Sequence, residues 1–485
     1  MEHFDIAIAG AGPGGSSAAA TAASLGLKTV FFERAGAVGQ KNASGCGLGQ
    51  RWWRDFPEIM EKIELLPSYR EIHFCQFKIT DENDRLVTTI SSTRTKKDDE
   101  RITYKGRELA MTGASIYRCD LDPLFAEMAV KAGAELRVAT CITDVLKKDG
   151  RVCGLVTSKG EKISADVVIG ADGAHSTVAI QSGIRRRFDK KDITLIPQLD
   201  FGCSEKRMDD VIGDAELVWF GPYCGAYQVN FRDGFHLGLG QWLDLWDTKP
   251  VDMIRRIVKI PAFQAMCRAL DAEVREYQVH MLPWMPHPHQ TFTDAVLLVG
   301  DAGGFPCPLE GEGVWHAVWT GKMAAQTAAR ALSQGDVSAS ALSHYQTLWR
   351  NSPVGREYTY GQEFVNLWRN SAFNPKFMEK MVLFLGELQW LNFPSPIFDW
   401  SDDHMATFND HLGHVLDLLP ELSDFAQKNL FPLKKGISQE NVDKIAALVT
   451  RQVKSLVPKF VPEAVIHRFI RAKVARALYG KGAAQ

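Results

Sequence analysis

The sequence predicts an α/β protein in which segments of one parallel sheet are interrupted by an antiparallel sheet and followed by helices. Three observations predict this fold class. The first ~35 residues alternate an apolar strand, a glycine turn, a small-residue helix and a second apolar strand. Residues 190–280 contain β-prone stretches rich in Trp, Tyr and Phe, and from about residue 340 the pattern is helical to the end.

The glycine turn lies in DIAIAGAGPGGSSAAA, where Gly10, Gly12 and Gly15 form G-x-G-x-x-G between strand and helix. In a Rossmann-like unit the first glycine permits the tight turn, and the second lets the backbone approach a pyrophosphate at the helix N-terminus. The third permits close packing of helix on strand. Glu33 ends the next strand, where an acidic side chain hydrogen-bonds the ribose hydroxyls of an adenosine. A glycine turn in an unrelated α/β unit is the alternative for this segment alone.

Later segments repeat the buried-strand pattern. A helix is expected to start at Asp122-Pro123, and a hairpin turn is expected at Asp149-Gly150. Apolar strands end at Asp172-Gly173 and at Gly300-Asp301, and a second glycine turn and a long helix follow the latter. The expected division is a discontinuous nucleotide-binding domain (1–75, 110–185 and 280–340), an inserted substrate or cap domain (76–109 and 186–279) and a C-terminal helical region (341–485).

Composition narrows the function classes. The net charge of −2 gives no electrostatic argument for nucleic acid, so no nucleic-acid partner is expected. Nine cysteines without a Cys-x-x-Cys pair argue against a zinc ribbon or a cysteine-ligated iron–sulfur cluster, and the odd count favours reduced thiols. With no basic signal segment and no apolar run of ~20 residues, we expect a cytoplasmic protein.

Motifs after the glycine turn select the cofactor. An aspartate that leaves a strand as Asp301 does accepts a hydrogen bond from a ribityl hydroxyl, and the helix beyond Gly313 supports negative charge on a reduced flavin. Arg118, just before its own helix, reaches the phosphates or the ribityl chain. With the Asp172-Gly173 strand end, these motifs resemble the flavoprotein group that includes aromatic hydroxylases and geranylgeranyl reductases. The resemblance covers residues 1–335 and implies FAD.

Two branches of that group share features with this sequence. GDAGGFPCPLEGEGVWHAV is similar to the geranylgeranyl reductase version of the second turn, and SGCGLG matches in part their Cys-Gly element. KNASG, at Lys41-Asn42 and onward, resembles instead electron-transfer-flavoprotein:quinone oxidoreductases and their relatives. By position, the reductase resemblance implies FAD contacts at Gly12, Gly14, Gly15, Glu33, Cys46, Gly47, Arg118, Ile142, Asp301, Gly313 and Val314.

The reductase resemblance also implies a reaction, in which reduced FAD delivers hydride to a C=C bond of a hydrophobic substrate and an acid protonates the other carbon. Tyr227 and Phe231 would line the substrate pocket from one strand face, although such aromatic sets are as often plain sheet core. Cys46 and Tyr227 are the catalytic candidates. The alternative for Cys46 is that a tight cofactor loop needs a small side chain.

Histidines offer further proton donors. His175 follows Asp172-Gly173 and His316 lies on the helix after Gly313, but a surface or packed histidine is the alternative for both. The spacing of His287 and His289 is too short to indicate a metal site, and no metal is expected.

The sequence departs from both branches. Prenyl reductases often carry Tyr-x-Trp-x-Phe-Pro in the cavity, whereas YQVNFRDG has Val229 and Arg232 at the second and last of these conserved positions, which puts a long prenyl chain in doubt. The quinone oxidoreductases carry a cysteine-ligated cluster domain that this sequence lacks. An electron relay to quinone from the flavin alone is therefore the second hypothesis, and a flavin monooxygenase, disfavoured by Gly-Glu-Gly, is the third.

Partners follow from these hypotheses and from the C-terminal tail. No typical NAD(P)H-binding domain is obvious, so a ferredoxin or partner flavoprotein is the expected electron donor, or quinone the acceptor. Residues 430–485 carry 11 Lys/Arg against 3 Asp/Glu, and an amphipathic helix is expected after Pro462. Such a helix suits peripheral contact with an anionic membrane, docking on an acidic protein or packing on its own domain.

Overall fold

The computed structural model describes most of the first 358 residues. Within them the residues not described are 42–43, 45, 82, 94–102, 105–106, 109–112, 222–223, 247 and 309–310, and beyond them the described residues are 361–362, 365, 368–369 and 470–471. The chain forms two compact units, residues 1–94 with 101–380 and residues 95–100 with 381–485. Only the first unit is described below, and the helix expected after Pro462 lies outside the described residues apart from 470–471.

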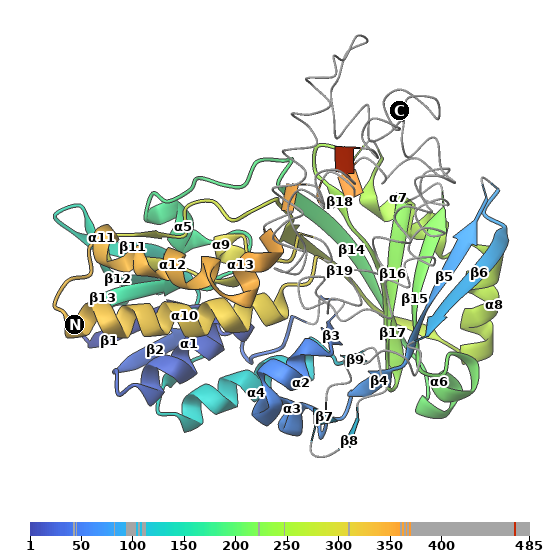
Figure 1. Cartoon of the computed structure of the whole chain (residues 1–485), viewed down its shortest axis with the longest axis horizontal. Coiled ribbons are helices and arrows are strands. Elements are labelled where there is room, and N and C mark those ends of the chain that lie inside the picture. The colour runs from blue at the N-terminus through green and yellow to red at the C-terminus, as the bar shows by residue number, and fades with distance from the viewer. Residues whose placement is uncertain are drawn as a thin grey trace, which may run out of the picture. The chain divides into compact units, whose positions relative to one another are not determined.

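A mixed eight-stranded sheet is built around the first strand, with the order β10–β2–β1–β13–β12–β11, and β21 joins β13 and pairs with β20 (Figure 1). The neighbours of β1 and the β13–β21 pair are parallel, and the β11–β12–β13 run is antiparallel. Its strands are β1 (His3–Ala9), β2 (Thr29–Phe32), β10 (Glu135–Arg137), β11 (Ile142–Lys148), β12 (Arg151–Thr157), β13 (Lys162–Gly170), β20 (Phe292–Thr293) and β21 (Val296–Leu298).

Helices cover one face of this sheet. Alanines and leucines of α1, α4 and α10 pack on alternate sheet residues such as Ile8 and Ile169, and α12 adds Tyr345 to the same core. The β11–β12 hairpin and α5 pack on the opposite face against residues such as Val168 and Leu298. These helices are α1 (Pro13–Ser24), α4 (Arg118–Lys131), α5 (Thr177–Gln181), α10 (Val314–Ser333) and α12 (His344–Arg350).

Local turn chemistry gives one confirmed expectation and one correction. The β11–β12 hairpin turns at Asp149 and Gly150, both with positive φ, as a type I′ turn requires. The helix expected to start at Asp122-Pro123 begins instead at Arg118, with Pro123 inside it. Pro123 forgoes only one backbone hydrogen bond near the start of α4, and the earlier start lets Asp122 pair with Arg118 one turn away.

A second eight-stranded sheet has the order β18–β14–β17–β16–β15–β5–β6, and β19 pairs with β14 (Figure 1). It is antiparallel except for the β5–β15 pair. Its strands are β5 (Phe74–Thr80), β6 (Leu86–Thr93), β14 (Ile193–Gly202), β15 (Ala215–Gly221), β16 (Cys224–Phe231), β17 (Gly234–Leu239), β18 (Gln241–Trp242) and β19 (Glu273–Pro283).

The two faces of this sheet differ in chemistry. One face carries Trp219, Phe235 and Leu237 and packs on three helices that the aromatic pattern did not predict, α6 (Glu205–Val211), α7 (Pro250–Ile257) and α8 (Pro261–Leu270). The other face carries polar and aromatic residues and meets the nucleotide-binding domain, because Tyr117 packs with Phe231. The predicted fold class is therefore confirmed, while the domain boundaries stay a prediction.

Short elements connect the two sheets. A three-stranded sheet of β3 (Gly47–Gly49), β9 (Gly113–Ser115) and β4 (Arg70–Ile72) lies beside α2 (Arg51–Asp55) and α3 (Pro57–Ile63). The remaining described elements are the pair β7 (Thr103–Tyr104) and β8 (Arg107–Glu108), and the helices α9 (Gly300–Gly303), α11 (Ala339–Leu342) and α13 (Pro353–Glu357).

At three places in or next to the first turn, a glycine backbone lies so close to another backbone segment that no side chain would fit. A Cβ at Gly15 would overlap the carbonyl oxygen of Gly10, and one at Gly10, whose φ is +102°, would overlap that of Ala171. A Cβ at Gly321 of α10 would overlap the carbonyl of Gly14 on α1. The glycines therefore set the distances from β1 to α1 and from α1 to α10.

Gly15→Ala should destabilise the fold, because its Cβ meets backbone that cannot yield without moving α1. We expect the free energy of unfolding to fall by about 1–3 kcal/mol, measured by urea denaturation. Gly36→Ala is the matched control, since no atom lies within 4 Å of its added Cβ. Equal unfolding midpoints for the two variants would contradict this account of the turn.

Candidate functional site

The first turn provides an open, positively charged place beside the start of α1. No described side chain caps the helix at Gly12, and the nearest atom to a Cβ there would be an Arg118 guanidinium nitrogen at 3.8 Å. Asp122 holds that guanidinium through two hydrogen bonds of 2.6 and 2.7 Å. Burial by itself would lower the pKa of Arg118, but the Asp122 carboxylate outweighs it and raises the pKa. A fixed cation thus lies beside a helix N-terminus that no described side chain caps, and a pyrophosphate site requires both features.

Glu33 and Ile142, the predicted adenosine contacts, lie near the end of one strand. Glu33 directly follows β2, and its backbone N–H and carbonyl bond to Arg137 and Thr140. One carboxylate oxygen also accepts the Ala35 N–H at 2.9 Å. Because Thr140 is bonded to Glu33, the start of β11 at Ile142 is brought near the same strand end.

Asp301 lies at the start of α9, close to the second glycine turn. Its carboxylate oxygen would be 3.3 Å from a Cβ at Gly313. Burial raises the pKa of Asp301, and the cations of Lys41 and Arg118 partly oppose that rise. The cations of Lys41 and Arg118 therefore act on the buried carboxylate beside the second glycine turn.

The Cys46 loop is held against the second sheet. Cys46 is buried, with a φ of +29°, which is unfavourable for a residue with a Cβ. Its N–H donates to Ser44 Oγ at 3.1 Å, and the Ser44 carbonyl accepts a hydrogen bond from His236 Nδ1 at 2.7 Å. Burial raises the pKa of the Cys46 thiol to about 12, so it stays protonated at neutral pH. Gly47 begins β3, and Asn42 of the Lys-Asn pair lies outside the described residues.

The second turn differs from the prediction in one respect. The N-terminus of α10 was expected to face the flavin, but Glu312 Oε1 accepts the N–H groups of Val314 at 2.7 Å and Trp315 at 2.9 Å. A carboxylate of the chain thus already balances this helix terminus. Cofactor contacts at Gly313 and Val314 stay predictions.

Glu312 belongs to a buried ring of four charged groups. Arg51 donates to Glu312 at 2.9 Å and also to Glu357, and His316 bridges the same two carboxylates, with Nε2 2.6 Å from Glu357 and Nδ1 3.3 Å from Glu312. Burial by itself would lower the pKa of His316, but the Glu357 and Glu312 carboxylates outweigh it and raise the pKa. Burial would likewise raise the pKa of Glu357, but Arg51 and His316 lower it to about 2. The ring joins α2, the second turn and α13.

Three potential metal ligands fall within this ring. The ligand atoms of Cys307, His316 and Glu357 lie within 4.8 Å of one another. The Cys307 thiol hydrogen-bonds Glu357, and Arg51 already pairs with both carboxylates of the ring. The Arg51 guanidinium balances the charge of the Glu312 and Glu357 carboxylates.

The face of the second sheet that meets the Cys46 loop carries the predicted pocket residues. The pairing register places Tyr227 opposite Gly238 and Phe231 opposite Gly234, so the two aromatic residues share a face as expected. The Tyr227 ring lies across Gly238, where no Cβ would fit, and its hydroxyl donates to Gln198 Oε1 at 3.0 Å. Tyr227 therefore already has a hydrogen-bond acceptor.

Polar side chains that the sequence analysis did not single out lie on the same face. Asp200 pairs with His236 across β14 and β17, and His280 lies opposite Ile196 on β19. Burial lowers the pKa of His236 to about 4 and that of His280 to about 3, so both imidazoles are neutral at physiological pH. In QLDF, residues 198–201, polar residues alternate with Leu199 and Phe201. This alternation could have indicated from the sequence that Asp200 lies on the polar face of its strand.

The Asp172-Gly173 region plays a structural part. One Asp172 carboxylate oxygen accepts the Val178 N–H at 3.2 Å at the start of α5. His175 is exposed, and His316 is buried with both ring nitrogens held by carboxylates. Neither histidine is thus presented to the second sheet as a free proton donor.

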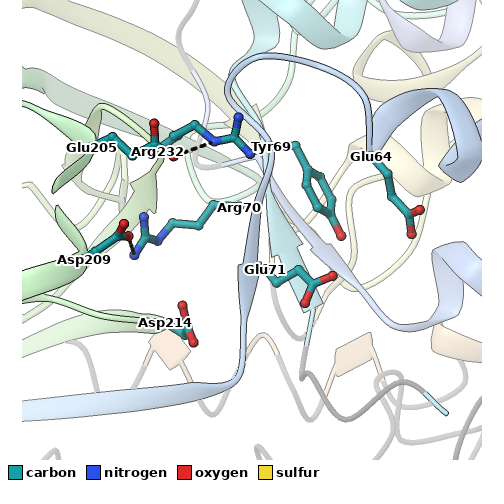
Figure 2. A pocket seen from close by; sticks show the side chains of 8 residues that line it. All are labelled: Glu64, Tyr69, Arg70, Glu71, Glu205, Asp209, Asp214 and Arg232. Carbon is teal, nitrogen blue, oxygen red and sulfur yellow. Dashed lines mark hydrogen bonds and ion pairs between the residues drawn. The ribbon is translucent and has the colours of Figure 1, made fainter. Parts of the chain in front are cut away.

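A polar hollow of 430 Å³ lies among residues outside the predicted site (Figure 2). Two ion pairs cross it, Arg70 with Asp209 at 2.9 Å and Arg232 with Glu205 at 3.3 Å. Its lining residues are Glu64, Tyr69, Arg70, Glu71, Glu205, Asp209, Asp214 and Arg232. An open hollow whose arginines are paired with local carboxylates is not suited to an apolar ring system.

The residues at the two turns fit FAD. The space beside Gly12, the Arg118 cation and the open helix terminus suit a pyrophosphate, Glu33 suits a ribose, and buried Asp301 suits a ribityl hydroxyl. The Cys46 loop and the sheet face with Tyr227 lie beyond these groups. They would bound the end of the cofactor that reacts.

Comparisons with known proteins agree with this geometry. A family model described as an FAD binding domain matches residues 3–224. A digeranylgeranylglycerophospholipid reductase of Methanothrix thermoacetophila is 30% identical over 365 residues, 73% of this chain and 84% of that protein. Digeranylgeranylglycerophospholipid reductase 2 of Methanococcoides burtonii is 28% identical over 368 residues, 73% of this chain and 82% of that protein.

Solved structures show the same fold. A geranylgeranyl bacteriochlorophyll reductase-like protein of Thermoplasma acidophilum has a TM-score of 0.67 at 21% identity and covers 87% of this chain and 100% of its own. A flavin-dependent brominase has a TM-score of 0.60 at 18% identity, covering 85% and 98%. No helix among the described residues is both long and apolar enough to cross a bilayer.

Glu357→Gln should destabilise the protein strongly, because it leaves Arg51 and His316 buried without their shared carboxylate. We expect the free energy of unfolding at pH 7 to fall by about 3–5 kcal/mol, measured by urea denaturation. In the unmodified protein, the ionised Glu357 carboxylate stabilises the fold at pH values above 4.5, the usual pKa of Glu. This stabilisation is lost as pH falls toward 2, because the pKa of Glu357 is lowered in the folded state. The His316 contribution has the opposite sign and is lost as pH rises through its raised pKa.

Glu205→Gln is the control for this experiment, because it breaks the exposed Arg232 pair. It should change the free energy of unfolding by less than about 1 kcal/mol. Similar losses for the two variants would show that the buried ring does not stabilise the fold through its charges.

Proposed function

The chain belongs to the geranylgeranyl reductase family of FAD-dependent oxidoreductases, and we propose that it saturates C=C bonds of a prenyl-type lipid. Relatives that cover most of the chain are named as reductases of a geranylgeranylated phospholipid. The observation within the chain that carries the proposal is the aromatic sheet face of Tyr227 and Phe231, set opposite the Cys46 loop. We propose that this face, with the Tyr117 ring that covers Phe231, meets the alkene beside the Cys46 loop.

We propose that the residues of the two turns hold FAD. Gly12 leaves room beside the start of α1, where the backbone of Gly14 and Gly15 would meet the pyrophosphate, and Arg118 would pair with its charge. Glu33 binds the adenosine ribose, next to Ile142. Cys46 with Gly47, and Asp301 with Gly313 and Val314, bound the ribityl and flavin end. Bound FAD, once reduced, supplies the hydride.

The proposed role of the second sheet is to orient the substrate and exclude water. Phe231 stacks on Tyr117 with ring centroids 3.8 Å apart, and Val229 belongs to the same buried cluster. Where prenyl reductases often have a tryptophan, Val229 leaves a smaller apolar surface. A short or partly reduced prenyl segment fits this face better than a fully extended chain.

Anaerobic reoxidation tests the function. The FAD-loaded protein, reduced with dithionite, should be reoxidised by a geranylgeranyl lipid faster than by a short-chain quinone, with a product two mass units heavier per saturated bond. The same lipid with all double bonds saturated is the matched control and should leave the flavin reduced. Faster reoxidation by quinone without lipid product would favour the electron relay, and hydroxylated product with NADPH and oxygen would favour a monooxygenase.

We also propose that the protein reaches its lipid at an anionic membrane surface through the basic C-terminal segment, and that a ferredoxin or flavoprotein supplies the electrons. Support for the membrane contact is the excess of 11 Lys/Arg over 3 Asp/Glu in residues 430–485.

Flotation with vesicles tests this contact. The full chain should bind vesicles containing 30% phosphatidylglycerol more tightly than pure phosphatidylcholine vesicles, and binding should weaken at high salt. A variant with Arg468, Arg471, Lys473 and Arg476 changed to Gln should lose that preference. Equal binding of both proteins to both vesicle types would remove the membrane role.

A further inference from the structure

Saturation of a C=C bond consumes one proton for each hydride, so the protein needs an acid beside the substrate. The predicted candidates are poorly suited to this task. Burial raises the pKa of the Cys46 thiol to about 12, the Tyr227 hydroxyl already donates to Gln198, and both nitrogens of His316 face carboxylates. His175 is exposed.

Asp200 lies on the inner face of the second sheet and has a carboxyl oxygen without a hydrogen-bond partner among the described residues. It lies on the sheet face that carries Tyr227 and Phe231, in the register row of Val229 and His236. Only 7% of Asp200 is exposed, and its Oδ1 atom is buried with no hydrogen-bond partner among the described residues. A buried carboxylate oxygen without a donor is costly unless it is protonated or bound to a ligand.

The neighbours of Asp200 favour a protonated carboxyl. His236 Nδ1 faces the Ser44 carbonyl, which only accepts, so Nδ1 carries the hydrogen and Nε2 carries a lone pair. That Nε2 lies 3.7 Å from Asp200 Oδ1 and cannot donate to it. The Tyr117 hydroxyl, which packs over Gly234, is also buried without a hydrogen-bond partner among the described residues.

One cation and two carboxylates lie around the Asp200 carboxyl. Arg275 on β19 pairs with Asp233 at 2.8 Å, and Glu276 lies opposite Asp200 on the same strand. Burial raises the pKa of Asp200 to about 6; Arg275 opposes the rise, and Asp233 and Glu276 add to it. Asp200 therefore titrates nearer neutrality than Cys46, His236 or His280 on this side of the site.

We propose that Asp200 is the acid that protonates the substrate, with His236 as the residue that positions the Cys46 loop beside it. The inference rests on the proposed C=C reduction. One carbon of the double bond receives hydride, with its electron pair, from the reduced cofactor, and the other receives the Asp200 proton. Asp200 is left as a carboxylate and takes a new proton from water. The π bond is replaced by two C–H bonds, and charge balances.

His236 acts through the loop and not on the substrate. Only 1% of it is exposed, and its ring packs against Tyr117 and Phe231 with centroids 5.2 and 4.8 Å away. Its hydrogen bond to Ser44, which in turn accepts the Cys46 N–H, fixes the loop against the sheet. One side chain thus fixes the Cys46 loop beside the strand row that carries Asp200.

Asp200→Asn in the FAD-loaded full chain tests the acid. In stopped flow, reoxidation of the reduced flavin by the geranylgeranyl lipid should slow by about 10²–10⁴-fold. Reduction of benzoquinone protonates oxygen and not carbon, so reoxidation by benzoquinone should stay within about twofold of the rate of the unmodified protein. The lipid rate of the unmodified protein should fall with rising pH above about 6, where Asp200 loses its proton, and the variant should show no such limb. An infrared band of a protonated carboxyl near pH 5, absent from the variant, reports the proton without any substrate.

Asp233→Asn is the matched control. It removes a neighbouring negative charge, so it should keep lipid reduction and move the pH limb to lower values. Lipid rates that are equal in Asp200→Asn and the unmodified protein would overturn the role of Asp200 as the acid. Failure of the unmodified protein to reduce any lipid would instead overturn the proposed function, and the acid with it.

Discussion

The structure depends on one close contact, that of the Gly15 backbone with the carbonyl of Gly10. Because no Cβ fits between them, α1 starts directly against the end of β1, and the Arg118 guanidinium lies near Gly12 at that start. A second glycine contact, Gly321 on Gly14, brings α10 against α1 and with it the second turn. Both halves of the FAD site are therefore placed by backbone approaches that any larger residue would widen.

Buried charges then join segments that are far apart in sequence. The ring of Arg51, Glu312, His316 and Glu357 connects the segment after Cys46 to the start of α10 and to α13. Such a ring adds little net stability over an apolar core of equal volume, but loss of one member leaves charges unpaired. Glu312 also balances the N-terminus of α10, and the nearby cations of Lys41 and Arg118 act on the buried Asp301 carboxylate.

Because side chains alternate along each strand, the two faces of the second sheet have different roles. Residues such as Leu237 pack on α6, α7 and α8, and the residues between them face the flavin loop. On that inner face burial drives Asp200, His236 and His280 toward their neutral forms. An uncharged, dry surface suits an alkene, and a neutral carboxylic acid can still deliver a proton there.

The sequence by itself determined the α/β class and the glycine turn, because strand periodicity and glycine spacing are local properties of the chain. FAD followed from the resemblance of the later motifs to a flavoprotein group. The sequence also placed Tyr227 and Phe231 on one face, since alternation on a strand needs no knowledge of its partners. It did not give the start of α4, which the Arg118–Asp122 pair decides, or the capping of α10 by Glu312. Nor did it give the Asp200–His236 juxtaposition, because these residues are separated by a helix and two strands and meet only through the register of β14 with β17. Burial and partners set the chemistry of a carboxyl or a thiol, and both are created by the tertiary fold.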